Sequence, residues 1–280
     1  MSDKTGIGWT DATWNPVIGC TKVSQGCKLC YAKTLHDQRH KAYLAGKKIP
    51  AQYARSFEYI QVISERLTDP YRWRKPRRIF VNSMSDLFHE DLPFRYIAEV
   101  FTAMWQNPRH TFQVLTKRPG RLLEFYSWNY PPAMAAAEAR ADWLGSGPNI
   151  WLGTSTENQE TADQRIPLLK ETPAAIRFLS CEPLLGPIDI LRHIGTDRER
   201  KIPGQGIWIP PAIGWVIIGG ETGLGHRVMR IEWLEQIVED CRAAGVPVFV
   251  KQDSGGLPGG KGRIPDRLWI QRFPGQAVAA

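Results

Sequence analysis

The sequence predicts an α/β fold, specifically a partial (β/α) barrel of about six to seven parallel strands. Three observations predict it. Short β-branched or aromatic runs recur along the chain, each run stops at a cluster of Ser, Thr, Gly, Asp or Glu, and a helical stretch usually follows. Such alternation produces right-handed parallel units with helices outside the sheet. Functional groups then gather where the strands end.

Each predicted strand has an apolar interior and a polar end. The first is expected at residues 14–18 and leads into a loop rich in cysteine. The others are expected at residues 78–82, 111–115, 149–153, 175–179, 215–218 and 246–250.

Helices are expected between these strands. They are predicted at residues 31–45, 94–106, 119–126, 132–144, 159–171 and 231–244. The last one places apolar side chains on a single face, at Ile231, Leu234, Ile237, Val238 and Cys241.

The chain of 280 residues is long enough for one domain of this size, which we predict to span residues 1–280. Long loops are expected near residues 46–77 and 193–213. A hydrophobic content of 42% is that of a globular protein, and the apolar runs are too short to cross a bilayer. Five cysteines, an odd number, argue against a disulfide framework. We therefore expect a cytoplasmic protein without a membrane partner.

The net charge of +8 is concentrated in part in one short segment. That segment interleaves aromatic and basic residues, namely Tyr71, Arg72, Trp73, Arg74, Lys75, Arg77 and Arg78. Such a segment suits phosphates and unstacked bases, which makes nucleic acid a candidate partner. A solvated linker leading into the next strand explains the same residues, so both interpretations stay open.

The loop after the first strand holds Cys20, Cys27 and Cys30 with the spacing C-x6-C-x2-C. Three thiolates this close can converge on one metal centre, and Gly19 and Gly26 allow the tight turns that convergence needs. A zinc site would need a fourth ligand. His36 and His40 follow one helical turn apart, and they either supply this fourth ligand or are ordinary exposed helix residues.

This loop resembles that of the radical S-adenosylmethionine (radical SAM) superfamily, in which three thiolates hold a [4Fe–4S] cluster that also binds SAM. The superfamily spacing is C-x3-C-x2-C, and an aromatic residue usually stands where this chain has Leu29. Over nearly its full length the chain is similar to a phage-associated three-cysteine-motif family of radical SAM-like proteins. The matching blocks are residues 13–31, 80–88, 115–119 and 218–221.

The resemblance implies an iron–sulfur enzyme that cleaves SAM reductively and abstracts hydrogen from a substrate. It implies two cofactors, the [4Fe–4S] cluster and SAM, and a partner that donates electrons to the cluster. Gly219, Gly220 and Glu221 resemble the motif that binds the SAM amino group, although here they end the sixth strand rather than the second.

Other strand ends supply the remaining cofactor and substrate candidates. Ser83, Ser85 and Asp86 end the second strand and either bind SAM or cap a helix. Thr154, Ser155 and Glu157 end the fourth strand, where the superfamily contacts the SAM ribose. The candidates for anion contacts are Lys117 for the cofactor, and Arg118 and Lys251 for the substrate.

Cys181 directly follows the fifth predicted strand. A thiol donates hydrogen atoms to carbon radicals, and a cysteine does this in spore photoproduct lyases, which are radical SAM enzymes of DNA repair. The competing interpretation is a small buried residue. His89 is a candidate for acid–base chemistry because its ordinary pKa lies near neutrality.

Three functions follow from these residues. The first is a radical SAM-like enzyme acting on nucleic acid, in modification or repair. The second is a zinc-stabilised nucleic-acid-binding protein without catalysis. The third is a cluster enzyme that binds a nucleotide other than SAM.

Overall fold

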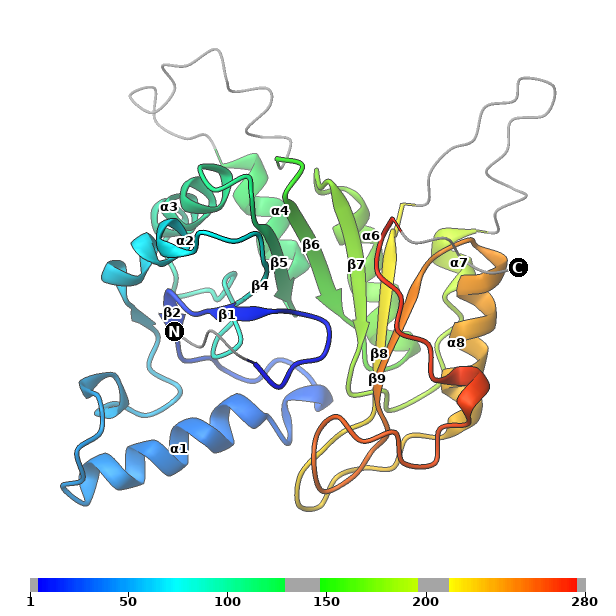
Figure 1. Cartoon of the computed structure of the whole chain (residues 1–280), viewed down its shortest axis with the longest axis horizontal. Helices are drawn as coiled ribbons and strands as arrows, with labels where there is room; N and C mark the ends of the chain where they lie inside the picture. The colour runs from blue at the N-terminus through cyan, green and yellow to red at the C-terminus, as the bar shows by residue number, and fades with distance from the viewer. Residues whose placement is uncertain (1–4, 129–146, 196–211, 276–280) are drawn as a thin grey trace, which may run out of the picture. The chain divides into compact units, whose positions relative to one another are not determined.

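The computed structural model describes residues 5–128, 147–195 and 212–275, and it confirms the predicted α/β class. Seven strands follow the order β1-β4-β5-β6-β7-β8-β9 in one sheet. The pairs β1/β4, β4/β5, β7/β8 and β8/β9 are parallel. Helices alternate with these strands along the chain, as Figure 1 shows. This order and direction are those of a partial (β/α) barrel.

The sheet strands lie close to their predicted positions. They are β1 (Ala12–Trp14), β4 (Arg78–Val81), β5 (Thr111–Thr116), β6 (Ile150–Ser155), β7 (Ile176–Cys181), β8 (Trp215–Gly219) and β9 (Val248–Gln252). Strands β6, β7 and β9 each run two residues further than expected. Four candidate site residues therefore lie inside strands rather than after them, namely Thr154, Ser155, Cys181 and Lys251.

The helices also match their predictions within a residue at each end. They are α1 (Tyr31–Leu44), α3 (Phe94–Trp105), α4 (Pro119–Ser127), α6 (Gln159–Lys170) and α8 (Ile231–Ala243). Two short helices, α2 (Asp69–Arg72) and α7 (Leu191–Ile194), were not predicted. Proline at the start of α4 and a capping box of Asn158 with Thr161 at the start of α6 explain two of the boundaries. The helix predicted at residues 132–144 lies outside the described residues.

The first strand was predicted too far along the chain, and the prediction of one continuous strand at residues 14–18 was wrong. Strand β1 ends at Trp14, and the next residues leave the sheet to form β2 (Val17–Ile18), which pairs antiparallel with β3 (Gln61–Val62). The physical reason is the Asn15-Pro16 step between them. Pro16 has no N–H to donate to a ladder, and the Asn15 side chain accepts a hydrogen bond from the Met84 N–H.

The chain divides into two compact units. The first comprises Met1–Trp151 and Thr172–Ala175, and the second comprises Leu152–Glu171 and Ile176–Ala280. The predicted single domain of residues 1–280 stays a prediction. The predicted loop at residues 46–77 contains α2 and β3 together with the 3-10 turns Ala51–Tyr53 and Ser64–Thr68. Most of the loop predicted at residues 193–213 lies outside the described residues.

The first unit buries one face of β4 and β5 beneath helices. Alternate strand residues point to that face and are almost fully buried, namely Ile79, Val81, Phe112 and Val114. Helix α3 contributes an apolar stripe at helical spacing, made of Ile97, Val100, Phe101 and Met104. This core fixes where β4 and β5 end, and therefore where the polar residues after them lie.

The second unit packs an aromatic cluster against a glycine. Trp215 of β8 contacts Phe178, Phe249 and Phe273 at ring-centroid distances of 5.7, 6.3 and 5.6 Å. A Cβ atom added to Gly153 of β6 would come within 2.5 Å of the Phe178 ring. Gly153 is therefore required by packing, because the ring occupies the volume of a side chain.

None of the helices in the described parts of the chain combines the length and the hydrophobicity that crossing a bilayer requires.

The contact at Gly153 gives a stability prediction. Gly153→Ala should lower the free energy of unfolding by about 1–3 kcal/mol, because the added methyl group overpacks against Phe178. Chemical denaturation measures this. In the double variant with Phe178→Leu the cost of the alanine should be smaller, since the ring is gone. Gly255→Ala is the control, because a Cβ there meets no atom within 4 Å. Equal losses in Gly153→Ala and Gly255→Ala would contradict the packing argument.

Candidate functional site

The cysteine loop of the first unit begins at a glycine that no other residue can replace without strain. Gly19 has φ +100°, and a Cβ atom there would lie 2.4 Å from the backbone oxygen of Tyr59. Its N–H donates to Met84 O at 3.1 Å, and the next N–H, of Cys20, donates to Phe57 O at 2.9 Å. Cys20 is thereby held against the loop that follows β4.

The three thiols lie within this unit and form no disulfide. All are partly buried. Cys20 and Cys30 pack against the same small apolar cluster, which contains Ile18 and Met84, and the charge of Cys27 acts on Cys20. Cys30 immediately precedes α1, whose first residue Tyr31 donates its hydroxyl to Ser83 O at 2.6 Å.

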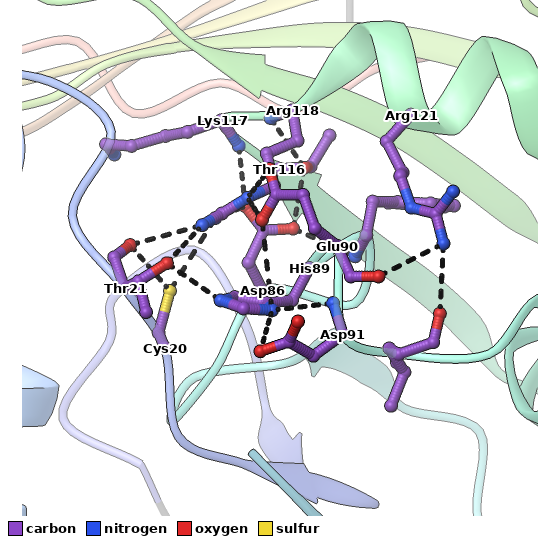
Figure 2. Close-up of polar contacts among 12 residues, drawn as sticks. Cys20, Thr21, Asp86, His89, Glu90, Asp91, Thr116, Lys117, Arg118 and Arg121 are labelled. Carbon is purple, nitrogen blue, oxygen red and sulfur yellow. Dashed lines mark hydrogen bonds and ion pairs between the residues drawn. The ribbon is translucent and has the colours of Figure 1, made fainter. Parts of the chain in front are cut away.

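Arg118, which follows β5, connects the cysteine loop to the ends of both strands. Figure 2 shows its guanidinium between Cys20, Thr21, Asp86 and Glu90. Nη1 donates to Asp86 Oδ2 at 3.2 Å and to Cys20 Sγ at 3.7 Å. Nη2 donates to the backbone and side-chain oxygens of Thr21 at 3.2 and 3.0 Å, and Nε donates to both Glu90 oxygens at 2.8 and 2.9 Å. All five guanidinium N–H groups are therefore engaged inside the protein.

Asp86 accepts three further hydrogen bonds in addition to holding Arg118 in place. Oδ1 accepts from Thr116 Oγ1 at 2.7 Å and from Phe88 N at 3.0 Å. Oδ2 accepts from Lys117 N at 3.0 Å as well as from Arg118. Asp86 and Arg118 are 6% and 7% exposed, so this is a buried ion pair whose remaining polar atoms are satisfied.

His89 joins the Arg118 network through Thr21. Its Nδ1 accepts from the Asp91 N–H at 3.1 Å, so the neutral ring carries its proton on Nε2 and donates to Thr21 Oγ1 at 2.8 Å. Burial and the neighbouring charge of Arg118 both lower the pKa of His89. The ring is therefore mainly neutral at physiological pH and orients Thr21.

The charges around Cys20 act in opposite directions. Burial raises the pKa of the Cys20 thiol to about 11, and the Asp86 carboxylate contributes to this rise, while Arg118 opposes it. Burial also lowers the pKa of Arg118, but the charge of Asp86 and the hydrogen bond to Glu90 outweigh it, and the net effect is a raised pKa. Arg118 is thus the permanent positive charge beside this sulfur.

The donor set fits an iron–sulfur cluster chemically, because cysteine thiolates are the usual protein ligands of such clusters and this loop carries three free thiols. In the described residues no three His, Cys, Asp or Glu side chains already stand close enough together to hold a metal ion. A metal centre on these thiols would therefore draw Cys20, Cys27 and Cys30 closer than they now lie.

The two histidines named as alternative zinc ligands differ in their surroundings. His36 is 0% exposed and packs against the rings of Tyr53 and Phe57 at 5.2 and 5.4 Å. His40 contacts Tyr53 O through Nδ1 at 2.7 Å. Both ring nitrogens of His36 are buried without a hydrogen-bond partner in the described structure, so a zinc ligand from α1 stays an open alternative.

Two of the residues predicted at the end of the second strand form hydrogen bonds within this unit. Ser83 Oγ accepts from Asn15 Nδ2 at 3.0 Å, and Ser85 Oγ donates to Val17 O at 3.0 Å. Both serines thereby tie the loop after β4 to the segment before the cysteines. Of the predicted set, the structure brings Cys20, Asp86, Lys117 and Arg118 together.

In the second unit, Gly219 and Gly220 are explained by close packing. A Cβ on Gly220 would lie 2.2 Å from Ser254 N, and one on Gly219 would lie 3.2 Å from the Glu182 carboxyl carbon. Glu221 accepts hydrogen bonds from Arg227 N and Nε at 2.9 and 2.8 Å. The resemblance to a SAM-binding motif therefore coincides with a turn that has its own structural requirements.

The other polar candidates of the second unit also have internal partners. Lys251 pairs with Glu182 at 2.5 Å. Glu157 pairs with Arg165 at 3.0 Å, and Ser155 O accepts from the same guanidinium at 2.8 Å. Thr154 is fully buried. Sequence reasoning did not anticipate Glu182, whose place directly after Cys181 at a strand end was the available signal.

Cys181 is in the core, and the structure gives no support to its predicted role as a hydrogen-atom donor. Its side chain is 0% exposed and contacts Thr156 Oγ1 at 3.3 Å. Burial raises its pKa to about 12. Its charge also acts on Cys241, which lies on the buried face of α8. The physical reason is that both faces of β7 are covered at this end, since Leu179 and Ser180 are buried as well.

Comparison with known proteins adds one match. Residues 4–261 match the model of a family described as a protein of unknown function, DUF5131. The chain belongs to the DUF5131 family. No curated protein and no solved structure matches the chain.

The Arg118 network was only partly predictable for this DUF5131 chain. Lys117 and Arg118 were singled out at a strand end, but Arg118 was assigned to a substrate anion. The structure instead gives Arg118 internal partners, of which Thr21 was not among the predicted site residues.

The buried ion pair gives a second prediction. Arg118→Met should lower the free energy of unfolding by about 3–5 kcal/mol, because Asp86 would be left as an unpaired buried charge. Denaturant unfolding of the metal-free protein measures it. Arg267→Met removes an arginine of an exposed pair with Glu235 and should have little effect. Similar losses in both variants would show that Arg118 has no special structural role.

Proposed function

We propose that the chain is an iron–sulfur, radical SAM-like enzyme whose [4Fe–4S] cluster is held by Cys20, Cys27 and Cys30. It would act on a nucleic acid, in modification or repair, with a separate protein donating electrons. A cytoplasmic location suits the free thiols. When bound, the cluster supplies the electron for reductive cleavage of SAM, and hydrogen abstraction from the substrate follows.

One observation carries this proposal, namely a loop of three free thiols placed beside the ends of parallel strands β4 and β5. Strand ends of this kind are where α/β folds place their reactive groups. The resemblance of residues 13–31 and 80–88 to the three-cysteine-motif family supports the same assignment.

The protein's own residues have definable tasks in this proposal. Gly19 and the hydrogen bond from Cys20 N to Phe57 O set the position of the first sulfur. Arg118 directs a positive charge at that sulfur, which stabilises its thiolate form. Asp86 keeps Arg118 in place.

Anaerobic reconstitution tests the cluster. Wild-type protein should bind about four irons with acid-labile sulfide, and adding SAM should change the electron paramagnetic resonance spectrum of the reduced protein. Cys20→Ala, Cys27→Ala and Cys30→Ala should each lose most of the iron. Cys241→Ala should keep it, since Cys241 is buried on α8.

Three results would oppose the proposal. Full iron content in a variant lacking all three cysteines would remove the assigned ligands. Zinc in place of iron after purification and reconstitution would favour the zinc-stabilised binding protein. A cluster whose spectrum ignores SAM would favour an enzyme that binds another nucleotide.

A further inference from the structure

The first unit has a second feature that the cysteine site does not use. A groove with a volume of about 510 Å³ lies between α2 and α3, which stand side by side in Figure 1. We call it the α2–α3 groove, and it is lined by Leu67, Thr68, Tyr71, Arg72, Glu99, Thr102 and Ala103. This volume is within the range of about 300–1,000 Å³ that is typical of small-molecule pockets, so one nucleotide base fits it.

One wall of the groove is an exposed aromatic ring. Tyr71 is 45% exposed, although the neighbouring Asp69 and Pro70 of the same short helix are buried. Its hydroxyl donates to Gln106 Oε1 at the end of α3, which fixes the direction of the ring. Trp105 adds a second partly exposed ring at the same end of α3. Exposed rings of this kind stack on unpaired bases.

A cluster of positive charges continues from the groove along the chain. Arg72, Arg74 and Lys75 are exposed, and Arg74 and Lys75 form no ion pair within the described part of the chain. Arg72 lies 3.8 Å from the buried Asp69 with a side chain that is 69% exposed.

Arg109 holds a further positive charge beside this cluster. Its Nε donates to Trp73 O at 3.1 Å, and its Nη2 donates to Tyr71 O at 3.3 Å. These bonds fix the basic segment on the unit, so it is an ordered surface and not only a solvated linker.

Glu99 is the one carboxylate among the residues that line the groove. Its carboxylate repels phosphate but accepts hydrogen bonds from the exocyclic amines of bases. A base would therefore enter the groove while its phosphates stay outside, along the exposed cations.

We propose that the α2–α3 groove and the adjoining cations form a binding site for single-stranded nucleic acid. One base stacks on Tyr71 with its amino group toward Glu99, and the backbone phosphates contact Arg72, Arg74, Lys75 and Arg109. The groove is lined by residues of α2, α3 and the turn before α2, none of which is among the partners of Cys20 or Arg118, so the two sites use different residues of this unit. The inference rests on the nucleic-acid part of the proposed function and names where that ligand binds.

Fluorescence anisotropy of the full chain with a labelled oligodeoxycytidylate of about 12 nucleotides tests this site. Tyr71→Ala should weaken binding about tenfold, because a stacked base loses its partner, and Tyr71→Phe should bind like wild type. Arg74→Ala with Lys75→Ala should weaken binding and make the log–log salt dependence shallower by roughly 0.7 for each phosphate that is no longer neutralised. Thermal unfolding confirms that each variant is folded.

The matched control is Lys47→Ala with Lys48→Ala, which removes the same charge from two exposed lysines just after α1. It should leave affinity nearly unchanged. Equal weakening by both double variants would show attraction by net charge alone and overturn the site. Unchanged binding in Tyr71→Ala, equal binding of a duplex of the same length, or equal competition by polyglutamate would overturn it as well.

Base choice gives an independent measurement. Oligodeoxycytidylate should bind more tightly than oligodeoxythymidylate, which lacks an exocyclic amine, and Glu99→Gln should reduce that difference. No preference in wild type would contradict the assigned role of Glu99.

The two proposals can fail separately. Cys20→Ala should bind the oligonucleotide normally while losing iron, and Tyr71→Ala should keep iron while losing affinity. Normal iron content with no oligonucleotide binding in wild type would leave the cluster proposal standing and remove this one.

Discussion

The cysteine side of the first unit depends on one buried ion pair, between Asp86 after β4 and Arg118 after β5. The pair joins two strand ends that are 32 residues apart in the chain and fixes Thr116, Lys117 N and the cysteine loop around them. Burying two charges costs free energy that their attraction offsets only when the remaining polar atoms are satisfied. Here both side chains have such partners, so the pair defines a unique arrangement at the place where Cys20 enters.

Much of the fold could be predicted from periodicity, because buried strands and amphipathic helices carry strong local signals. Strands β4 to β9 and five helices lie within two residues of their expected bounds. The exception was residues 14–18. There Asn15 and Pro16 break the ladder through a side-chain hydrogen bond to Met84, a partner 69 residues away that no local pattern reveals.

The candidate site was less predictable, because residue type alone does not say which partner a charge will find. The sequence identified Cys20, Asp86 and Arg118, yet it assigned Arg118 to an external anion. Only the fold brings Thr21 and Glu90 to its donors. Cys181 shows the opposite limit, since a position at a strand end does not reveal whether the side chain is covered, and both faces of β7 are buried at this end.

The complete use of the Arg118 donors has an evolutionary consequence. Lysine offers three donors from one point and cannot reproduce a planar fork that reaches a thiol, a carboxylate and a threonine at once. Arg118 therefore cannot be replaced alone during evolution, and a substitution at Asp86 would select for compensating changes at Arg118. We expect these two positions to covary as a unit among relatives of this chain, with the surface residues around them free to diverge.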